Sequence, residues 1–275
     1  MTYVLGTDAA ERLRLQRQHN IWRADCLSGW DRAGFGSGDR LLDLGCGPGF
    51  ASLDLAQRVG PSGQVLGLDQ SPNFIEHLQQ QAQQLGLQQL RCEVINLGEP
   101  LASNDQAKIE PGSWDGAWCR WLCMFLADLD PLLDLCRTAL RPGGRLVLHE
   151  YIRWDSFSLH PRGTALANFV QRCMQHWRAQ GGDPNVASRL PALLQQRGFQ
   201  LLECRSLMAC SQGDQAKAQW LKDFLGSYPE RLAVAGLWQT ADQLELEQEL
   251  AAAAEQPSLW VTPALVEQIW ELPPS

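Results

Sequence analysis

The chain has 275 residues, of which 45% are hydrophobic and 20% charged, a balance typical of globular proteins and unlike that of disordered ones. Its net charge of −8 and pI near 5.1 disfavour nucleic acid and anionic membrane as partners, because an acidic surface repels phosphate. We expect no signal peptide and no membrane span, since neither pattern is present. The nine cysteines form no CxxC pair, so we expect reduced thiols in a cytoplasmic protein.

Helical and strand patterns alternate along the first half of the chain. A helix is expected over 8–30, before the alternation starts. The predicted strands are 40–45, 64–69, 90–96, 114–120 and 145–152, and the predicted helices between them are 50–60, 71–86 and 130–140, with a polar loop over 98–113. This alternation is typical of βαβ units, in which a parallel sheet carries helices on both faces.

The alternation pauses after Tyr151. Residues 153–187 are predicted to form a lid with a long helix around 162–180; a helix over 188–197, a strand over 199–209, one amphipathic helical stretch over about 214–255 and a final strand over 259–272 follow. With no second boundary, we expect one domain: a helical lid (1–37), a cofactor-binding core (38–152), a lid insertion (153–187) and the rest of the sheet with a helical insertion (188–275).

The loop after the first predicted strand reads LLDLGCGPGF and carries three alternating glycines, Gly45, Gly47 and Gly49. In a doubly wound sheet this loop faces the ligand crevice, and glycine lets the backbone approach a ligand closely. The dinucleotide fingerprint GxGxxG fails here, because the spacing is GxGxG. The glycine spacing therefore argues against a nicotinamide-dependent oxidoreductase, which we keep as an alternative.

A wider pattern accompanies these glycines. Asp43 lies two residues before Gly45, Asp69 ends the second predicted strand, WDGAW belongs to the fourth, and LRPGG precedes the fifth. Together these features resemble the class I S-adenosylmethionine-dependent methyltransferases, in particular the small-molecule branch. The resemblance covers about 38–152 and extends weakly through LVEQIWELPP. It implies a seven-stranded, mostly parallel α/β sheet with an antiparallel last strand.

The resemblance also implies roles for the glycine loop. Gly45, Gly47 and Gly49, with Cys46 between the first two, would pass under the methionine and ribose part of S-adenosylmethionine. Asp43 would orient the amino end of the cofactor. A carboxylate at the end of the second strand, Asp69, would accept hydrogen bonds from both ribose hydroxyls.

Further positions would surround the other parts of the cofactor. Gln70 would flank the adenine, and Asn96, followed by Leu97, would bind the adenine amino group in place of the family's usual aspartate. Arg120 and Trp121, at the tip of the fourth strand, would lie beside the cofactor sulfur. No metal site is expected, because no Cys/His cluster has metal spacing.

Candidate acceptor-side residues end the fifth predicted strand. Alternation puts His149 and Tyr151 on one face, so either could act on the acceptor, His149 as a base and Tyr151 by orienting it. Arg120 could hold an anionic acceptor. The eleven tryptophans favour a hydrophobic or aromatic small molecule as methyl acceptor. A non-catalytic S-adenosylmethionine-binding regulator remains an alternative to the enzyme.

Overall fold

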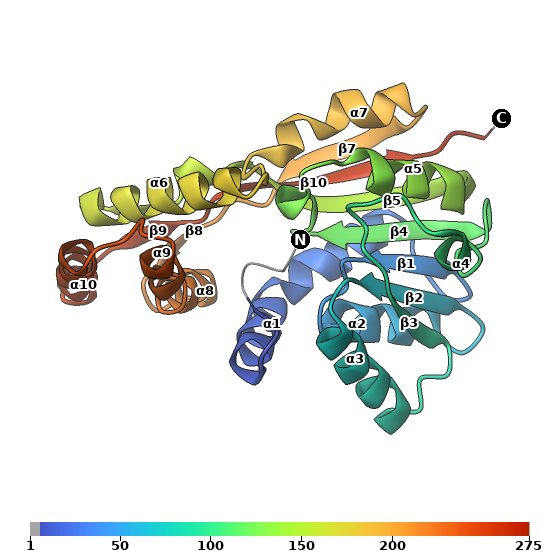
Figure 1. The fold of residues 1–275 in the computed structure, drawn as a ribbon, viewed down its shortest axis with the longest axis horizontal. Coiled ribbons are helices and arrows are strands. Elements are labelled where there is room, and N and C mark those ends of the chain that lie inside the picture. The colour runs from blue at the N-terminus through green and yellow to red at the C-terminus, as the bar shows by residue number, and fades with distance from the viewer. Residues whose placement is uncertain (1–5, 275) are drawn as a thin grey trace.

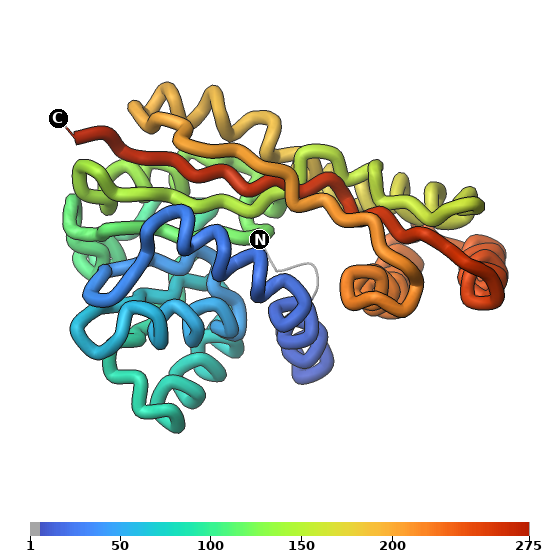
Figure 2. The backbone as a smooth tube through the Cα atoms, turned by 180° about the vertical axis from the view of Figure 1, so that it is seen from behind, coloured from blue at the N-terminus to red at the C-terminus, as the bar shows by residue number. Residues whose placement is uncertain are grey.

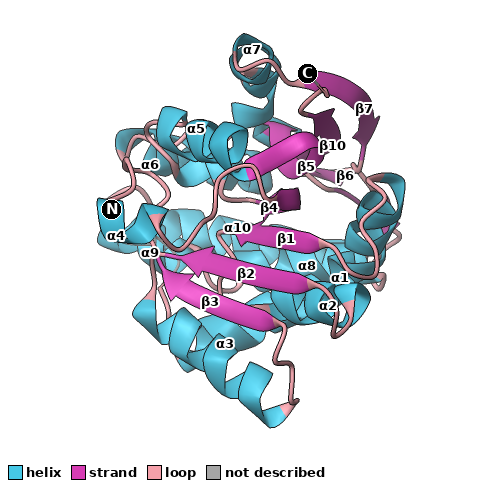
Figure 3. Ribbon diagram, turned by 90° about the vertical axis from the view of Figure 1, so that its right-hand side faces the viewer, coloured by secondary structure: helices cyan, strands magenta, loops and turns pink. Residues whose placement is uncertain are grey.

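The computed structural model describes residues 6–274, and its centre is a seven-stranded sheet in the order β3-β2-β1-β4-β5-β10-β7 (Figure 1). The strands are β1 (Arg40–Leu44), β2 (Gln64–Asp69), β3 (Leu90–Val94), β4 (Trp114–Arg120), β5 (Leu140–Arg153), β7 (Gln200–Ser206) and β10 (Ala264–Glu271). The first five strands are parallel, and β10 runs antiparallel to both of its neighbours. Figure 3 shows β1, β2 and β3 side by side with a common direction. The predicted sheet, including its antiparallel last strand, is confirmed.

Helices cover both faces of this sheet, which confirms the doubly wound prediction. One core contains apolar residues of α1 (Ala9–Arg32), among them Cys26 and Trp30, and of α2 (Phe50–Val59) and α3 (Pro72–Gln84). Those of α5 (Asp130–Ala139) and α7 (Leu190–Gln196) belong to the other. Successive side chains of a strand point to opposite faces of the sheet, so Leu41 belongs to the first core and Leu42 to the second. No helix within residues 6–274 is long and apolar enough to cross a membrane.

Local signals explain where the core helices begin and end. The Ser71 hydroxyl accepts a hydrogen bond from the Phe74 amide at 3.3 Å, and Pro72 occupies the first turn, so α3 starts as the sequence predicts. Gly60 follows the last residue of α2, with a φ of 66°. The predicted loop over 98–113 contains a short helix, α4 (Ser103–Gln106), and β5 begins at Leu140, five residues before the predicted start.

The region from Trp154 to Pro263 contributes a second unit, which we call the cap. It comprises α6 (Thr164–Ala179), α8 (Ala216–Leu225), α9 (Pro229–Val234), α10 (Thr240–Ala254) and a three-stranded sheet of β6 (Ser158–His160), β8 (Cys210–Gln212) and β9 (Leu259–Val261) in the order β6-β9-β8. Figures 1 and 2 show the cap helices at one end of the molecule, reached by the long run of β9 and β10.

Two sequence predictions are wrong in the cap. The single helical stretch over 214–255 is three helices, because Gly226, Pro229 and Gly236 interrupt the pattern. The final strand over 259–272 is two strands in different sheets. Pro263 separates them, and it has no backbone N–H to donate to a ladder. The long helix predicted around 162–180 is confirmed as α6.

Candidate functional site

A cavity of about 410 Å³ lies where the parallel strands β1, β2, β4 and β5 end. One part is lined by residues at and after the ends of β1, β2 and β3: Asp43, Gly45 to Pro48, Phe50, Ala51, Asp69, Gln70, Phe74 and Ile95 to Glu99. The other part is lined by segments that follow β4 and β5, by α1 and by the cap. We call these parts the glycine-loop half and the aromatic half. Ligands bind at such strand ends in open α/β sheets.

Two of the three glycines open toward this cavity. Gly45 and Gly47 both line it and have φ values of 70° and 55°, where side chains other than glycine are strained. A Cβ on Gly47 would meet nothing within 4 Å. The Gly47 amide donates a hydrogen bond of 2.9 Å to Oδ2 of Asp69, which fixes the loop against the end of β2. The loop at Gly47 is thus held in place and has free space beside it, so a ligand could approach its backbone closely.

Gly49 has a different reason to be glycine, and the geometry of the loop does not support its predicted place under the cofactor. It does not line the cavity. A Cβ there would lie 2.2 Å from Cδ1 of Leu78, a buried residue of α3. The φ of Gly49 is 89° at the N-cap of α2. The third glycine therefore lets α2 pack closely against α3, a packing role that sequence spacing alone did not reveal.

Two carboxylates flank the glycine loop, as the sequence predicts. Asp43 is 2% exposed and accepts a 2.5 Å hydrogen bond from the Ser52 hydroxyl, and burial raises its pKa to about 6. Asp69 accepts hydrogen bonds from the amides of Gly47 and Ser71, at 2.9 and 2.8 Å. Burial raises the pKa of Asp69 as well. Both residues line the cavity, with Cys46 between them.

Gln70, Asn96 and Leu97 also line the glycine-loop half. The side-chain oxygen of Asn96 accepts a hydrogen bond from the Gly98 amide at 3.0 Å, which orients the side chain in the loop after β3. A carbonyl oxygen has a second lone pair, so Asn96 retains acceptor capacity for a ligand amino group. The structure thus brings these three predicted residues to the same cavity as Asp69.

Arg120 and Trp121 reach the boundary between the two halves. The Arg120 guanidinium donates to Sγ of Cys26 at 2.8 Å and to Nδ1 of His19 at 3.2 Å, and its charge lies 4.9 Å from the Trp121 ring centroid. Trp121 has a φ of 55°, a left-handed conformation that is costly for a bulky residue. Its amide donates to the His149 carbonyl at 3.1 Å. Strain of this kind concentrates at functional sites.

Parallel aromatic rings form the wall of the other half. Trp121 stacks between Tyr151 and Trp220, with ring centroids 5.9 and 5.6 Å away and interplanar angles of 11° in both cases. Further aromatic residues complete the lining: Phe125, Trp154, Phe157, Trp177 and Phe224. The sequence analysis missed Trp220 and Phe224. Their spacing of four residues puts both on one face of α8, which is a signal that could have placed them.

His149 contradicts its prediction as a base that acts on the acceptor. It is fully buried and does not line the cavity, although Tyr151 does. Its Nε2 lies 2.6 Å from Oε2 of Glu267, and its ring packs edge-on against Trp118. Burial lowers the pKa of His149 despite this carboxylate. Helix α1 covers the imidazole: a Cβ on Gly29 would lie 3.3 Å from its Nε2.

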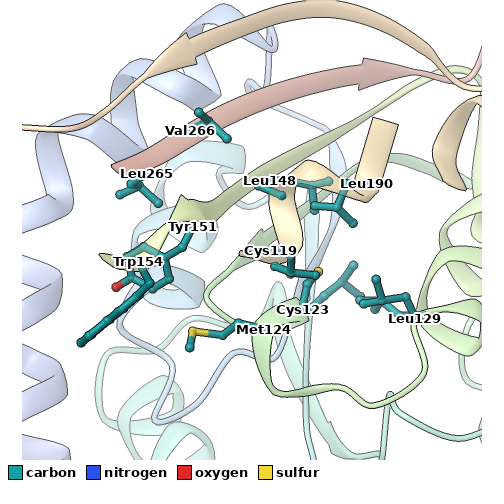
Figure 4. Close-up of a cluster of buried hydrophobic side chains, with 14 of the residues drawn as sticks. Cys119, Cys123, Met124, Leu129, Leu148, Tyr151, Trp154, Leu190, Leu265 and Val266 are labelled. Atoms are coloured by element: carbon teal, nitrogen blue, oxygen red, sulfur yellow. The ribbon is translucent and has the colours of Figure 1, made fainter. Parts of the chain in front are cut away.

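Sequence spacing also missed a cluster of possible metal ligands behind the cavity wall. Cys119, Cys123 and Glu150 are buried, and their ligand atoms lie within 4.8 Å of one another (Figure 4 shows the two thiols). Oε1 of Glu150 accepts hydrogen bonds from the amides of Leu122 and Cys123, at 2.9 and 2.7 Å. Burial raises the pKa of Glu150 to about 7. These contacts give the cluster a structural role, because they hold the segment after β4 that lines the cavity.

Residues 35–222 match the family model described as "Methyltransferase domain". The chain is 35% identical over 135 residues to the demethylmenaquinone methyltransferase of Lactococcus lactis, covering 49% of each chain. It is 31% identical over 140 residues to the 2-phytyl-1,4-naphtoquinone methyltransferase of Trichormus variabilis, covering 50% of this chain and 56% of that protein. The chain thus spans about half the length of these two relatives.

Solved structures share the fold over nearly the whole chain. The cyclase SpnF superposes with a TM-score of 0.59 at 18% identity, covering 94% of this chain and 83% of the other. The geranyl diphosphate C-methyltransferase of Streptomyces coelicolor, crystallised with S-adenosyl-L-homocysteine, gives 0.58 at 17% identity, with 98% and 86% covered. At these identities the likeness shows the fold alone. Together with the family match, the fold, the open Gly47 and the paired carboxylates show that the chain belongs to the class I S-adenosylmethionine-dependent methyltransferases.

Proposed function

We propose that the protein transfers a methyl group from S-adenosylmethionine to a small apolar or aromatic acceptor. One observation carries this proposal: a single cavity joins the glycine loop and Asp69 to the aromatic wall around Trp121. The first half suits the cofactor and the second suits a flat organic molecule, so both reactants would meet at the boundary. The names of the two quinone methyltransferases support an acceptor of quinone type.

The residues of the glycine-loop half would hold the cofactor. Asp69 lines the cavity and would accept hydrogen bonds from the ribose hydroxyls with the remaining lone pairs of its two oxygens. Gly47 would lie against the ribose and methionine part of the cofactor, because no protein atom occupies the space beside its Cα. Asn96 and Gln70 would contact the adenine, and Leu97 would pack beside it. Asp43 would orient the amino group of the methionine part.

The cofactor supplies an activated methyl group, so the protein mainly has to position the acceptor and exclude water. Trp121 and Tyr151 provide a flat apolar surface for that purpose. We propose that α1 and the cap together close the cavity, because Gln18, Trp177 and Leu221 all contribute to its lining. The chain would act as one methyltransferase domain, with the lid of 1–37 formed by α1; residues 1–5 of that lid lie outside the described part.

A nicotinamide cofactor is disfavoured by the glycine spacing and by the family match. A non-catalytic regulator would also bind S-adenosylmethionine, and the fold shared with a cyclase does not by itself specify methyl transfer. The aromatic half favours an enzyme, because a regulator has no need of a second compartment open to the cofactor. All nine cysteines are free thiols, which supports a cytoplasmic location.

Calorimetry with S-adenosylhomocysteine and with NAD tests the cofactor, and methyl transfer from labelled S-adenosylmethionine to a panel of quinols and phenols tests the acceptor. We expect binding of the sulfur ligand, none of NAD, and label transfer to at least one aromatic compound. Binding of NAD without response to S-adenosylhomocysteine would contradict the proposal. Tight binding of S-adenosylhomocysteine with no transfer to any aromatic acceptor would favour the regulator.

A further inference from the structure

The charged groups of the cavity are distributed unevenly. All three carboxylates that line it, Asp43, Asp69 and Glu99, belong to the glycine-loop half. Among the described lining residues of the aromatic half, the ionisable side chains are Arg14, Arg120 and Tyr151. Arg14 is already neutralised, because Glu11 lies 2.7 Å away. One positive charge without an ion-pair partner among residues 6–274, Arg120, therefore lies at the boundary of the aromatic half, where it also acts electrostatically on the buried Asp43.

No histidine lines the cavity within the described part of the chain. His149 is enclosed by Glu267 and α1, and His19 has both ring nitrogens in hydrogen bonds, to Arg120 and Asp54. An acceptor that must lose a proton during the reaction would find no imidazole or carboxylate in the aromatic half. Proton removal by a base on the protein is thus poorly supported by this arrangement.

Arg120 is instead built into a rigid position. Because an arginine nitrogen can only donate, Nδ1 of His19 must accept from it, and the imidazole proton must be on Nε2. That Nε2 donates to Oδ2 of Asp54 at 3.1 Å, and Arg23 holds the same carboxylate from the other side at 2.6 and 3.1 Å. Burial lowers the pKa of His19, which keeps the imidazole neutral. A chain from Asp54 through His19 thus orients the guanidinium.

Both recorded hydrogen bonds of Arg120 go to uncharged groups, Cys26 and His19, and none of residues 6–274 forms an ion pair with it. A guanidinium beside aromatic rings, where water is scarce, interacts more strongly with an anion than it would in bulk water. From this geometry, and resting on the proposed methyl transfer, we infer that the acceptor is an aromatic acid bound as its oxyanion, such as a phenolate or enolate, with Arg120 as its counter-charge and His19 as a positioning residue.

This inference accounts for the missing base. When an oxyanion takes up the methyl group, a bond forms between the acceptor and the methyl carbon, and the carbon–sulfur bond breaks with its electron pair remaining on sulfur. No proton has to move in that step. The acceptor's own acidity, increased by the neighbouring guanidinium, replaces a general base of the protein.

The carboxylate of the methionine part of the cofactor is a second anion, which Arg120 could bind instead of the acceptor. Two pairs of probe molecules distinguish the acceptor anion from the cofactor carboxylate as the group that Arg120 binds. S-Adenosylhomocysteine and 5′-methylthioadenosine differ in the amino-acid part and report on the cofactor carboxylate. In the presence of saturating S-adenosylhomocysteine, 2-hydroxy-1,4-naphthoquinone, an anion at neutral pH, and its neutral ether 2-methoxy-1,4-naphthoquinone report on the acceptor anion.

We expect wild-type protein to bind the anionic probe about tenfold or more tightly than the ether, the scale of one charge-assisted hydrogen bond. Arg120→Gln should abolish this preference, and His19→Leu should reduce it while the charge remains. Arg17→Gln is the control for loss of one positive charge on α1: its side chain is exposed, lies outside the cavity lining and pairs with Asp223, so the variant should keep the preference. Circular dichroism and 5′-methylthioadenosine affinity report whether each variant is folded.

The result that overturns the inference is equally specific. Equal affinity of wild-type protein for the two naphthoquinones, or a preference that survives Arg120→Gln, would exclude Arg120 as the acceptor's counter-charge. A loss of S-adenosylhomocysteine affinity in Arg120→Gln, with unchanged 5′-methylthioadenosine affinity and unchanged acceptor preference, would assign Arg120 to the cofactor. Failure of wild-type protein to bind S-adenosylhomocysteine would instead contradict the proposed function itself.

Discussion

Nε2 of His149 on β5 lies 2.6 Å from Oε2 of Glu267, its register partner on β10, and both side chains are buried. Glu267 also accepts hydrogen bonds from Arg205 on β7, at 2.5 and 3.2 Å. The pair therefore joins the last three strands of the sheet below α1. A histidine at the end of a parallel strand looks catalytic in sequence, but here its contacts are structural.

His149→Gln should consequently affect stability and leave cofactor binding unchanged. Glutamine cannot reproduce the imidazole contact, so Glu267 loses one of its buried partners at a cost of about 1–3 kcal/mol in the free energy of unfolding. Chemical denaturation measures the loss, and calorimetry with S-adenosylhomocysteine measures the affinity. A variant as stable as the wild type, or one with impaired cofactor affinity, would show that the role assigned to His149 is wrong.

Gly47 and Gly49 are predicted to fail in different ways when alanine replaces them. Gly47→Ala should weaken S-adenosylhomocysteine binding at least tenfold with a stability loss of only about 1–2 kcal/mol, because the new Cβ meets no protein atom and the backbone strain is that of one left-handed residue. Gly49→Ala should lower the melting temperature more, since its Cβ would collide with Leu78.

A second substitution tests the cause of the Gly49 effect. Leu78→Ala makes room for the new methyl group, so the double variant should lose less stability than the sum of the two single variants. Additive losses would mean that Leu78 is not the obstacle. Wild-type cofactor affinity in Gly47→Ala would show that the ligand does not approach the loop at that residue.

Asp69→Ala should weaken S-adenosylhomocysteine binding by about 1–3 kcal/mol, the scale of hydrogen bonds to a charged group. The carboxylate also orders the glycine loop through the Gly47 amide, so loss of that contact adds to the effect. Calorimetry gives the affinity, and Glu76→Ala, on the exposed side of α3, serves as a control for loss of one negative charge. Equal affinities in the two variants would mean that the ribose binds elsewhere.

Glu150 should make stability depend on pH. Its pKa is raised from 4.5 to about 7 by burial, so between these values the folded protein holds a proton that the unfolded chain has released. Stability from this group is therefore complete below about pH 4.5 and falls as pH rises through 7, by on the order of 3 kcal/mol in total.

Glu150→Gln isolates this contribution, because glutamine keeps an oxygen for the amides of Leu122 and Cys123 but does not ionise. The difference in unfolding free energy between wild type and variant, measured by urea denaturation from pH 5 to pH 8, should move in favour of the variant as pH rises. The buried histidines, whose pKa values are lowered, contribute equally to both proteins and cancel. A difference that stays constant with pH would refute the prediction.

Local sequence signals were sufficient for the core of the fold. The capping serine Ser71, the terminal Gly60 and the apolar strands act over a few neighbouring residues, so their effects can be recognised without a structure. In the cap, Gly226, Pro229 and Pro263 interrupted elements that hydrophobic periodicity alone treated as continuous. These glycine and proline residues can be seen in the sequence. The sheet that β9 joins, however, depends on its pairing with β6 and β8, which lie far away along the chain.

The sequence by itself thus determined the doubly wound sheet, the loop at the end of β1 and the acidic residue at the end of β2. Tertiary structure alone decided what surrounds each candidate. Alternation puts His149 and Tyr151 on one face, but only the packing of α1 buries the first and leaves the second in the cavity. Similarly, Arg120 became an oriented, unpaired charge through His19 on a helix about a hundred residues earlier. The physical reason is range: strand direction and turn chemistry are local, whereas burial, charge pairing and cavity shape arise between segments that meet only after folding.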